Sequence, residues 1–288
     1  MKMKPQAYQA HRVHPFAPVA PRTCTLPQRI VVAKARQLPD ALLFDCDGVL
    51  VDTERDGHRI SFNEAFKQKG LDHEWDVDLY GELLEIGGGK ERMTKYFNDH
   101  PDREPFRSTQ DPAARKALVA ELHALKTALF TQLVESGAMP LRPGVARLVG
   151  EAISAGVPVA VCSTSNEKAV SSIVRVMLGP QVAEVMRVFA GDIVPKKKPD
   201  PAIYLLAARE LGVDPARCVV VEDSGIGLKA AKAAGMTCIV TKSSYTAGED
   251  FSAADAVFPS LGEDSDPDRV TLDRLCQLLE QAQANALA

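Results

Sequence analysis

From residue 145 onward, short apolar runs alternate with segments whose apolar residues recur at helical spacing. The short runs have the length and continuous hydrophobicity of buried strands, which we expect at 157–162, 185–190, 218–221 and 238–240. The helical pattern predicts helices at 145–155, 201–211 and 228–234, with Gly156 and Gly212 as stop signals. Strands that alternate with helices indicate right-handed βαβ units. We therefore predict an α/β fold with a doubly wound parallel sheet, Rossmann-like in its architecture.

A further strand is predicted at residues 41–44, far upstream of the others. Between it and the later strands lies a stretch of about 80 residues with helical spacing and few β-branched residues. We interpret this stretch as a helical cap inserted into the α/β domain. The predicted domains are a core at residues 40–57 and 140–288 and a cap at residues 58–139.

Residues 1–39 differ in composition from the rest of the chain. They contain six prolines and seven bases, and neither an acid nor a serine. Such a segment is poor material for a core, and its basic, acid-poor character is typical of an organellar targeting leader, although such leaders usually favour serine. A disordered basic tail or a cloning remnant is the alternative.

Charge and cysteine usage exclude several classes of protein. Residues 40–288 carry a formal charge of −11, so we expect no affinity for nucleic acid or an anionic membrane. No apolar run approaches the roughly 18 residues of a membrane helix. None of the six cysteines is spaced C-x-x-C, which argues against a zinc knuckle or a redox pair.

Polar side chains follow three of the predicted strands. Carboxylates occur at 45 and 47 after the first strand and at 222 and 223 after the strand at 218–221, and hydroxyls occur at 163–165. Ligands bind at the carboxyl ends of the strands in an open parallel sheet, so these groups share one crevice. Four carboxylates repel one another unless a cation neutralises them, and an all-oxygen set favours Mg²⁺. The basic run 196–198 completes a predicted phosphate site, in which we expect only Lys198 to point inward.

The D-x-D pair suggests how such a site performs chemistry. Asp45 and Asp47 are two residues apart, so both can face the crevice. A carboxylate beside a phosphoryl group can attack phosphorus and form an aspartyl phosphate. The other carboxylate can protonate the leaving alcohol and then activate water. We assign Asp45 as nucleophile and Asp47 as general acid and base.

Four ordered motifs resemble those of the haloacid dehalogenase superfamily. They are D-C-D-G-V-L-V-D-T-E (45–54), V-C-S-T-S-N (161–166), K-K-P-D-P-A-I-Y (197–204) and V-V-V-E-D-S-G-I-G-L-K-A-A (219–231). The resemblance implies a phosphatase in which Ser163 and Lys198 hold the transferring phosphoryl group. It also implies that Mg²⁺ is bound by Asp45, the backbone carbonyl of Asp47 and Asp223, with Glu222 as a ligand or as a neighbour of one.

Within the superfamily, the helical insertion after the first motif resembles the β-phosphoglucomutase-like branch. Stretches such as G-G-G-K-E-R-M (87–93) and S-T-S-N-E-K-A (163–169) are similar to the CbbY-like proteins, above all to their plastid form. That resemblance implies hydrolysis of xylulose-1,5-bisphosphate, a by-product of Rubisco, to xylulose 5-phosphate. It also implies an enzyme of the chloroplast stroma, with the cytoplasm as the alternative location. We expect a monomer whose partner is a small sugar bisphosphate.

A bisphosphate needs a second phosphate site, which we expect the cap to supply. Lys90 follows glycines that allow close approach, and His123 and Lys126 share a face of one predicted helix. The predicted substrate contacts are Glu54, Gly88, Gly89, Lys90, Glu91, His123, Lys126, Arg142, Ser163, Thr164, Ser165, Asn166 and Lys198.

Three alternatives remain open. A phosphomutase of the β-phosphoglucomutase type would share the same core and pass the phosphoryl group to a sugar hydroxyl. The run Gly225-x-Gly227-x-x-Ala230 matches a dinucleotide fingerprint and would suit an NAD-binding oxidoreductase, although Glu222 and Asp223 would repel a pyrophosphate. A catalytically silent binding protein on this fold is the third. We interpret His58 as structural and Cys46 as packing beneath the strand.

Overall fold

The computed structural model describes residues 37–86 and 88–286. The predicted leader falls almost entirely on residues 1–36, which lie outside the described part, so the structure does not bear on it.

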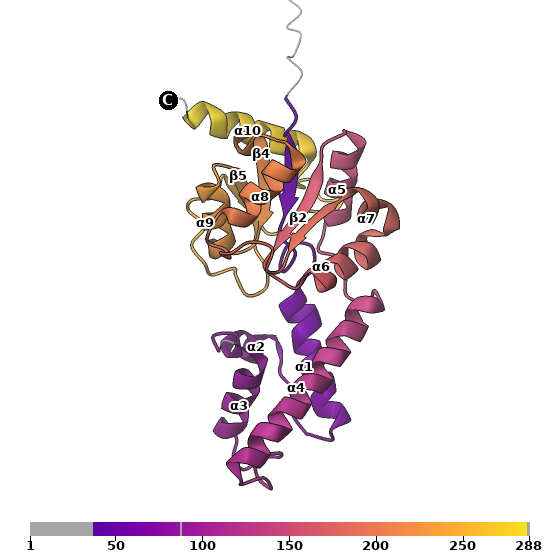
Figure 1. Ribbon diagram of the computed structural model, residues 1–288, viewed down its shortest axis with the longest axis vertical. Helices are drawn as coiled ribbons and strands as arrows, with labels where there is room; N and C mark the ends of the chain where they lie inside the picture. The colour runs from indigo at the N-terminus through magenta and orange to yellow at the C-terminus, as the bar shows by residue number, and fades with distance from the viewer. Residues whose placement is uncertain (1–36, 87, 287–288) are drawn as a thin grey trace, which may run out of the picture. The chain divides into compact units, whose positions relative to one another are not determined.

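A six-stranded sheet forms the centre of the core, and all its strand pairs are parallel (Figure 1). Its spatial order is β3-β2-β1-β4-β5-β6. The strands are β1 (Ala41–Phe44), β2 (Val159–Ser163), β3 (Arg187–Ala190), β4 (Cys218–Glu222), β5 (Thr237–Thr241) and β6 (Ala256–Phe258). The doubly wound parallel sheet predicted from the alternating pattern is confirmed, and β1 lies at its centre between β2 and β4.

Helices cover both faces of this sheet because successive strand residues point to opposite faces. Leu42 and Phe44 of β1 belong to a hydrophobic cluster with α5 (Val145–Ser154) and α10 (Leu272–Ala286). Ala41 and Leu43 belong to the opposite cluster, with α8 (Ala202–Leu211) and α9 (Gly225–Ala233). The remaining helical elements of the core are α6 (Glu167–Ile173), η2 (Val174–Leu178), α7 (Pro180–Val185) and η3 (Pro215–Arg217). Burial on both faces explains why the strands are continuously apolar.

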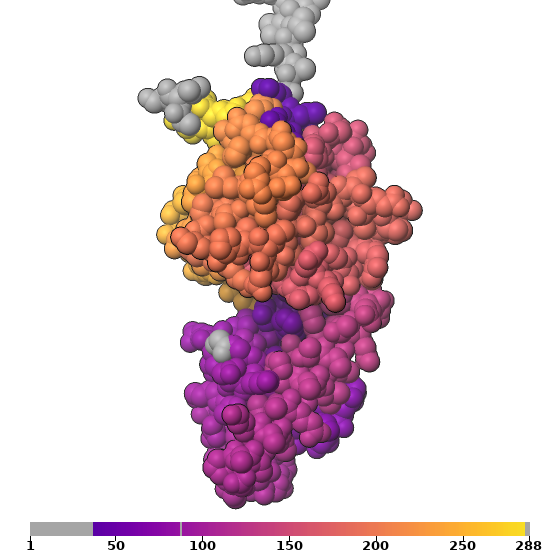
Figure 2. All heavy atoms as spheres, viewed as in Figure 1, coloured from indigo at the N-terminus to yellow at the C-terminus, as the bar shows by residue number. Residues whose placement is uncertain are grey.

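The insertion predicted after the first strand is helical, and we call it the cap. A π-helical turn, η1 (Thr53–His58), leads into α1 (Arg59–Gln68), α2 (Val77–Leu83), α3 (Gly89–Asp99) and α4 (Pro112–Glu135). These helices enclose a separate hydrophobic cluster with an aromatic centre that includes Phe62, Trp75 and Tyr80. In the space-filling view the cap is the lower, purple-to-magenta part of the surface (Figure 2).

Helix α4 is long and apolar enough, by length and composition alone, to cross a membrane. No membrane helix was predicted, because no uninterrupted apolar run in the sequence approaches roughly 18 residues. In the structure, Val119 and Leu122 of α4 belong to the hydrophobic cluster of the cap, and Asp111 caps the helix by accepting a hydrogen bond from the Ala114 amide. The helix therefore has a packing role within the cap.

Several elements differ from the sequence prediction. The strand predicted at 185–190 begins only at Arg187, because helix α7 extends to Val185. Helix α9 begins at Gly225 and not at 228, because Ser224 accepts a hydrogen bond from the Gly227 amide and caps the helix. The strand β6 and the helix α10 were not predicted. Only three residues long, β6 gives too short a pattern to detect.

Candidate functional site

Asp45 follows β1 and Glu222 ends β4, and the side chain of Lys198 lies between these two carboxylates. Lys198 Nζ lies 2.5 Å from Asp45 Oδ1 and 2.7 Å from Glu222 Oε1. The lysine side chain is 5% exposed and that of Glu222 is fully buried. Burial lowers the pKa of Lys198, but Asp45 and Glu222 outweigh this effect and raise it above its ordinary value. The lysine is therefore a permanent cation.

Asp45 keeps one oxygen available. Lys198 donates to Oδ1, and no donor among residues 37–86 and 88–286 bonds to Oδ2. Burial is the largest influence on this carboxyl, and despite Lys198 its pKa is well above the ordinary value. A further cation at the site would favour the ionised, nucleophilic form.

Asp47 is held by hydroxyl groups. Its Oδ1 accepts a hydrogen bond of 2.7 Å from Thr53, and its Oδ2 accepts one of 2.5 Å from Ser165. Ser163 lies at 3.4 Å from the same Oδ2. Asp47 therefore bonds both to η1, at the entrance of the cap, and to the end of β2.

Asp223 lies beside the glycine of the first motif. A Cβ atom added at Gly48 would lie 1.9 Å from Asp223 Oδ2, so only glycine allows this approach. Gly48 also has a φ of +79°, which disfavours other residues. Burial and the neighbouring Glu222 raise the pKa of Asp223 to about 7.

The three acids fit a hard divalent cation. Carboxylate oxygens of Asp45, Glu222 and Asp223 all lie within 4.8 Å of one another, and all three residues are buried. A single lysine does not neutralise three buried carboxylates, and an all-oxygen donor set suits Mg²⁺. The Asp47 side chain is outside this cluster, so its predicted contribution would have to come through the backbone carbonyl.

A cleft of about 880 Å³ opens beside Asp47 and Asp223. The cap contributes residues such as Glu54 and Gly81, and the core contributes the loop around Tyr245. Every charged residue that lines it within the described ranges is an acid. An anionic substrate can approach such a cleft only where a cation offsets this charge.

Two buried cations of the cap, Lys126 and Arg92, lie near Glu54, which lines the cleft. Lys126 is buried, and its Nζ donates to His58 Nδ1 at 2.8 Å and lies 4.7 Å from the centre of the Phe62 ring. Burial lowers the pKa of Lys126 to about 8 and, together with Lys126, that of His58 to about 3. Arg92 donates to the Tyr80 hydroxyl at 2.9 Å, and Tyr80 donates to Glu54 at 2.6 Å. We call Glu54, His58, Tyr80, Arg92, His123 and Lys126 the cap cluster.

Three other predicted substrate contacts belong to this region. His123 contributes to the lowered pKa of His58, and burial lowers its own pKa. A Cβ atom added at Gly89 would lie 2.9 Å from the His123 ring, so the glycines at the start of α3 allow this close approach. Gly88, with a φ of +95°, caps the same helix. Gly89 therefore has a packing role, and Gly88 supplies the positive φ at the start of the helix.

The structure places other predicted contacts elsewhere. Lys90 and Glu91 are exposed and line a separate groove of about 730 Å³ between α3 and α4. Arg142 donates to the carbonyl oxygens of Gly48, Thr241, Lys242 and Pro259, and so fastens core loops together.

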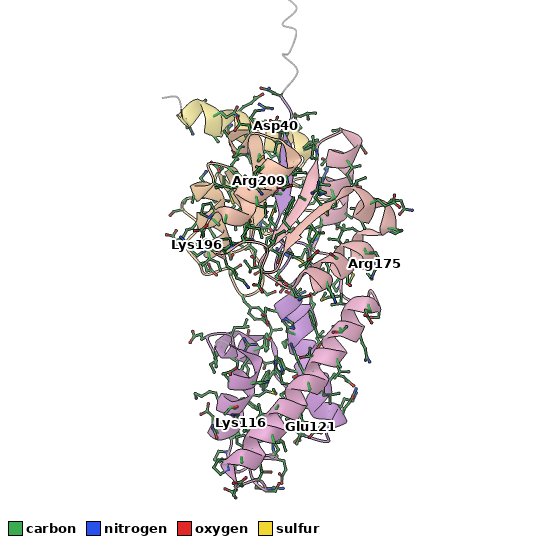
Figure 3. All side chains as sticks on the ribbon, viewed as in Figure 1. Asp40, Lys116, Glu121, Arg175, Lys196 and Arg209 are labelled. Atoms are coloured by element: carbon green, nitrogen blue, oxygen red, sulfur yellow. The ribbon has the colours of Figure 1, made fainter. Side chains whose placement is uncertain are left out.

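Asn166 caps α6 through hydrogen bonds from the amides of Lys168 and Ala169. Its neighbour Thr164 is partly buried beside Ser163. Lys196 and Lys197 were predicted to be solvated. Both are exposed, and they pair with Asp200 and Asp192 respectively; Lys196 is labelled in Figure 3.

Several residues of the site were not singled out from the sequence. Thr53 and Tyr204 lie inside the first and third motifs, and Arg92 lies inside G-G-G-K-E-R-M. Their place within these motifs was the available signal. His58 was assigned a structural role, yet it is the hydrogen-bond partner of Lys126.

The dinucleotide-like run has a different explanation. A Cβ atom added at Gly227 would lie 2.0 Å from the Glu222 carboxyl carbon. The glycine therefore allows α9 to pack against a buried carboxylate, which leaves no place for a pyrophosphate.

Comparison with known proteins assigns the class. A model of the haloacid dehalogenase-like hydrolase family matches residues 39–235, and the chain belongs to this family. It is a phosphatase of the family, related to the CbbY proteins. A CBBY-like protein from Arabidopsis thaliana is 68% identical over 228 residues, which are 78% of this chain and 70% of that protein. Protein CbbY from Cereibacter sphaeroides is 43% identical over 225 residues, which are 78% of this chain and 93% of that protein.

A solved structure shows the same relation. A mutant CbbY from Rhodobacter sphaeroides, crystallised in complex with xylulose-1,5-bisphosphate, is 42% identical with a TM-score of 0.59. The match covers 78% of this chain and 97% of the CbbY chain. The prediction of a CbbY-like phosphatase on a haloacid dehalogenase fold is confirmed.

The contact between Gly48 and Asp223 generates a prediction. Gly48→Ala should push the Asp223 carboxylate aside and abolish Mg²⁺ binding, measured by calorimetry on the folded protein. Gly70→Ala is the matched control, because Gly70 has a φ of +66° and no atom within 4 Å of its added Cβ. The control should cost about 1 kcal/mol of stability and leave Mg²⁺ binding intact. Equal Mg²⁺ binding by both variants would contradict the placement of Asp223.

Proposed function

We propose that the protein is a Mg²⁺-dependent phosphatase that converts xylulose-1,5-bisphosphate to xylulose 5-phosphate and phosphate through an aspartyl phosphate on Asp45. The observation that carries the chemistry is the asymmetry of Asp45, whose Oδ1 is bound to Lys198 while Oδ2 has no donor among the described residues. The complex of the related CbbY with xylulose-1,5-bisphosphate supports the substrate.

In the first step, Asp45 Oδ2 attacks phosphorus and the bond to the sugar oxygen breaks. Lys198 remains bound to Asp45 and offers its third N–H to an oxygen of the phosphoryl group, together with the Ser163 hydroxyl. Mg²⁺ held by Asp45, Asp223 and the Asp47 carbonyl would supply charge neutralisation for the developing anion.

Asp47 acts as the general acid and then as the general base. Protonated Asp47 donates to the leaving sugar oxygen, and the resulting carboxylate then takes a proton from the water that attacks the aspartyl phosphate. The hydrogen bonds from Thr53 and Ser165 hold its two oxygens in place between these steps. Because Thr53 belongs to η1, at the entrance of the cap, the position of Asp47 depends on the cap.

The cap cluster suits the second phosphate. Lys126 and Arg92 are buried cations near Glu54 of the acidic cleft, and each has polar neighbours that can rearrange around an anion. We assign the distal phosphate to these two residues with His123, and the sugar hydroxyls to Glu54. Closure of the cap over the cleft would exclude bulk water from the reaction.

We further propose that the enzyme works as a monomer in the chloroplast stroma. The supporting observations are the acid-free, basic composition of residues 1–39 and the 68% identity to a plant protein. The charge of −11 on residues 40–288 supports the absence of nucleic acid or membrane partners. Import into isolated chloroplasts of the full chain and of residues 40–288 tests the location.

The nucleophile is tested by Asp45→Asn. The amide cannot form the acyl phosphate, so phosphate release from xylulose-1,5-bisphosphate should fall by at least about 10⁴-fold while the circular dichroism spectrum is unchanged. In the wild-type protein, chelation of Mg²⁺ should stop the reaction reversibly. A folded variant that still turns over would refute the assignment, and formation of an isomeric sugar phosphate in place of free phosphate would indicate a mutase.

The distal site is tested by Lys126→Met. Removal of a buried charge should raise the free energy of unfolding at pH 7 by up to about 3 kcal/mol, because burial lowers the pKa of Lys126 from 10.5 to about 8. Between pH 8 and pH 10.5 the unfolded wild-type protein binds more protons than the folded one, so its free energy of unfolding rises with pH. The difference in stability between the variant and the wild type should therefore shrink over this range.

The same variant should lose substrate binding. We expect its KM for xylulose-1,5-bisphosphate to rise by at least about 10-fold, with little change for p-nitrophenyl phosphate, which has no second phosphate. Lys116→Met, an exposed position on the same helix, is the matched control and should change neither. A wild-type KM for the bisphosphate would exclude Lys126 from the distal site.

A further inference from the structure

The Glu222 carboxylate has a donor for each of its lone pairs. Its Oε1 accepts hydrogen bonds from Lys198 at 2.7 Å and from the Tyr204 hydroxyl at 2.5 Å. Its Oε2 accepts from the Asp223 amide at 3.1 Å and from the Ser224 hydroxyl at 3.3 Å. A carboxylate offers about four such positions, so Glu222 has none left for a metal ion in this arrangement.

Tyr204 contacts both members of the buried ion pair. It is fully buried on α8 as the last residue of the lysine motif, and its ring centre lies 5.1 Å from Lys198 Nζ. Its hydroxyl bonds to the same oxygen of Glu222 that Lys198 contacts. The ring therefore supports the ammonium group, and the hydroxyl fixes the carboxylate that the ammonium group faces.

We propose that Tyr204 is a positioning residue that keeps Glu222 turned toward Lys198 and away from the cation, so that Asp45 and Asp223 are the side-chain ligands. With Glu222 fixed, two Lys198 N–H groups point to Asp45 and Glu222, and the third is left for the phosphoryl group. The inference rests on the proposed roles of Asp45, Lys198 and Mg²⁺. Loss of the Tyr204 hydroxyl frees a lone pair of Glu222, and this carboxylate can then turn toward the cation as an added ligand.

Tyr204→Phe separates this role from packing, because it keeps the ring and removes only the hydroxyl. We expect Mg²⁺ to bind at least about 3-fold more tightly in calorimetry without substrate, while kcat for p-nitrophenyl phosphate falls by about 10- to 100-fold. Tyr96→Phe is the matched control, because its buried hydroxyl lies 3.3 Å from His73 Nδ1 in the cap, away from the cation site. The control should lose comparable stability and change neither Mg²⁺ affinity nor kcat.

The outcomes are distinguishable from failure of the proposed function. Wild-type protein that shows no Mg²⁺-dependent release of phosphate from xylulose-1,5-bisphosphate would overturn the function itself. If the wild type is active, two results would overturn the inference about Tyr204. One is a Tyr204→Phe variant with unchanged kcat, and the other is a slower variant whose Mg²⁺ binding is unchanged or weaker. Should Tyr204→Phe fail to fold, Ser224→Ala removes the side-chain donor to Glu222 Oε2; tighter Mg²⁺ binding supports the inference and unchanged binding overturns it.

Discussion

The site depends on the buried contact of Lys198 with Asp45 and Glu222. Three carboxylates from the ends of two neighbouring strands lie within 4.8 Å of one another, in a place where burial penalises every charge. The lysine offsets part of their repulsion and turns one oxygen of Asp45 away from the reaction. The remaining negative charge is what makes the same place suitable for a divalent cation.

This arrangement also explains the division of charge across the substrate cleft. The charged lining is acidic and repels a phosphate group, so under the proposed function the reacting phosphate lies beside the cation and Lys198. The proposed second phosphate then needs its own cations, which we assign to the buried Lys126 and Arg92 of the cap cluster. The proposed preference for a substrate with two phosphates rests on these two separate groups of cations.

The core of the site could be predicted from the sequence because most of its residues lie at the ends of strands. The motif residues follow directly after strands, and adjacent parallel strands must end at one edge, so Asp45, Ser163 and Asp223 had to meet. The cap was harder to predict, because a helical pattern gives faces but no orientation. Lys90 was predicted to face the substrate but lies in a separate groove, and Arg142 bonds to carbonyl oxygens of the core. His58 was predicted to be structural, and its contact with Lys126 forms only because α1 and α4 pack together. Elements without a strong period, such as β6 and α7, were missed for the same reason.

The most direct measurement is mass spectrometry of the protein quenched in acid during turnover of xylulose-1,5-bisphosphate with Mg²⁺. The account predicts one phosphoryl group on the peptide that contains Asp45, in an acyl linkage that hydroxylamine cleaves. A phosphoryl group on Ser163 or on another residue, or no phosphorylated protein during rapid turnover under conditions that trap acyl phosphates, would contradict it.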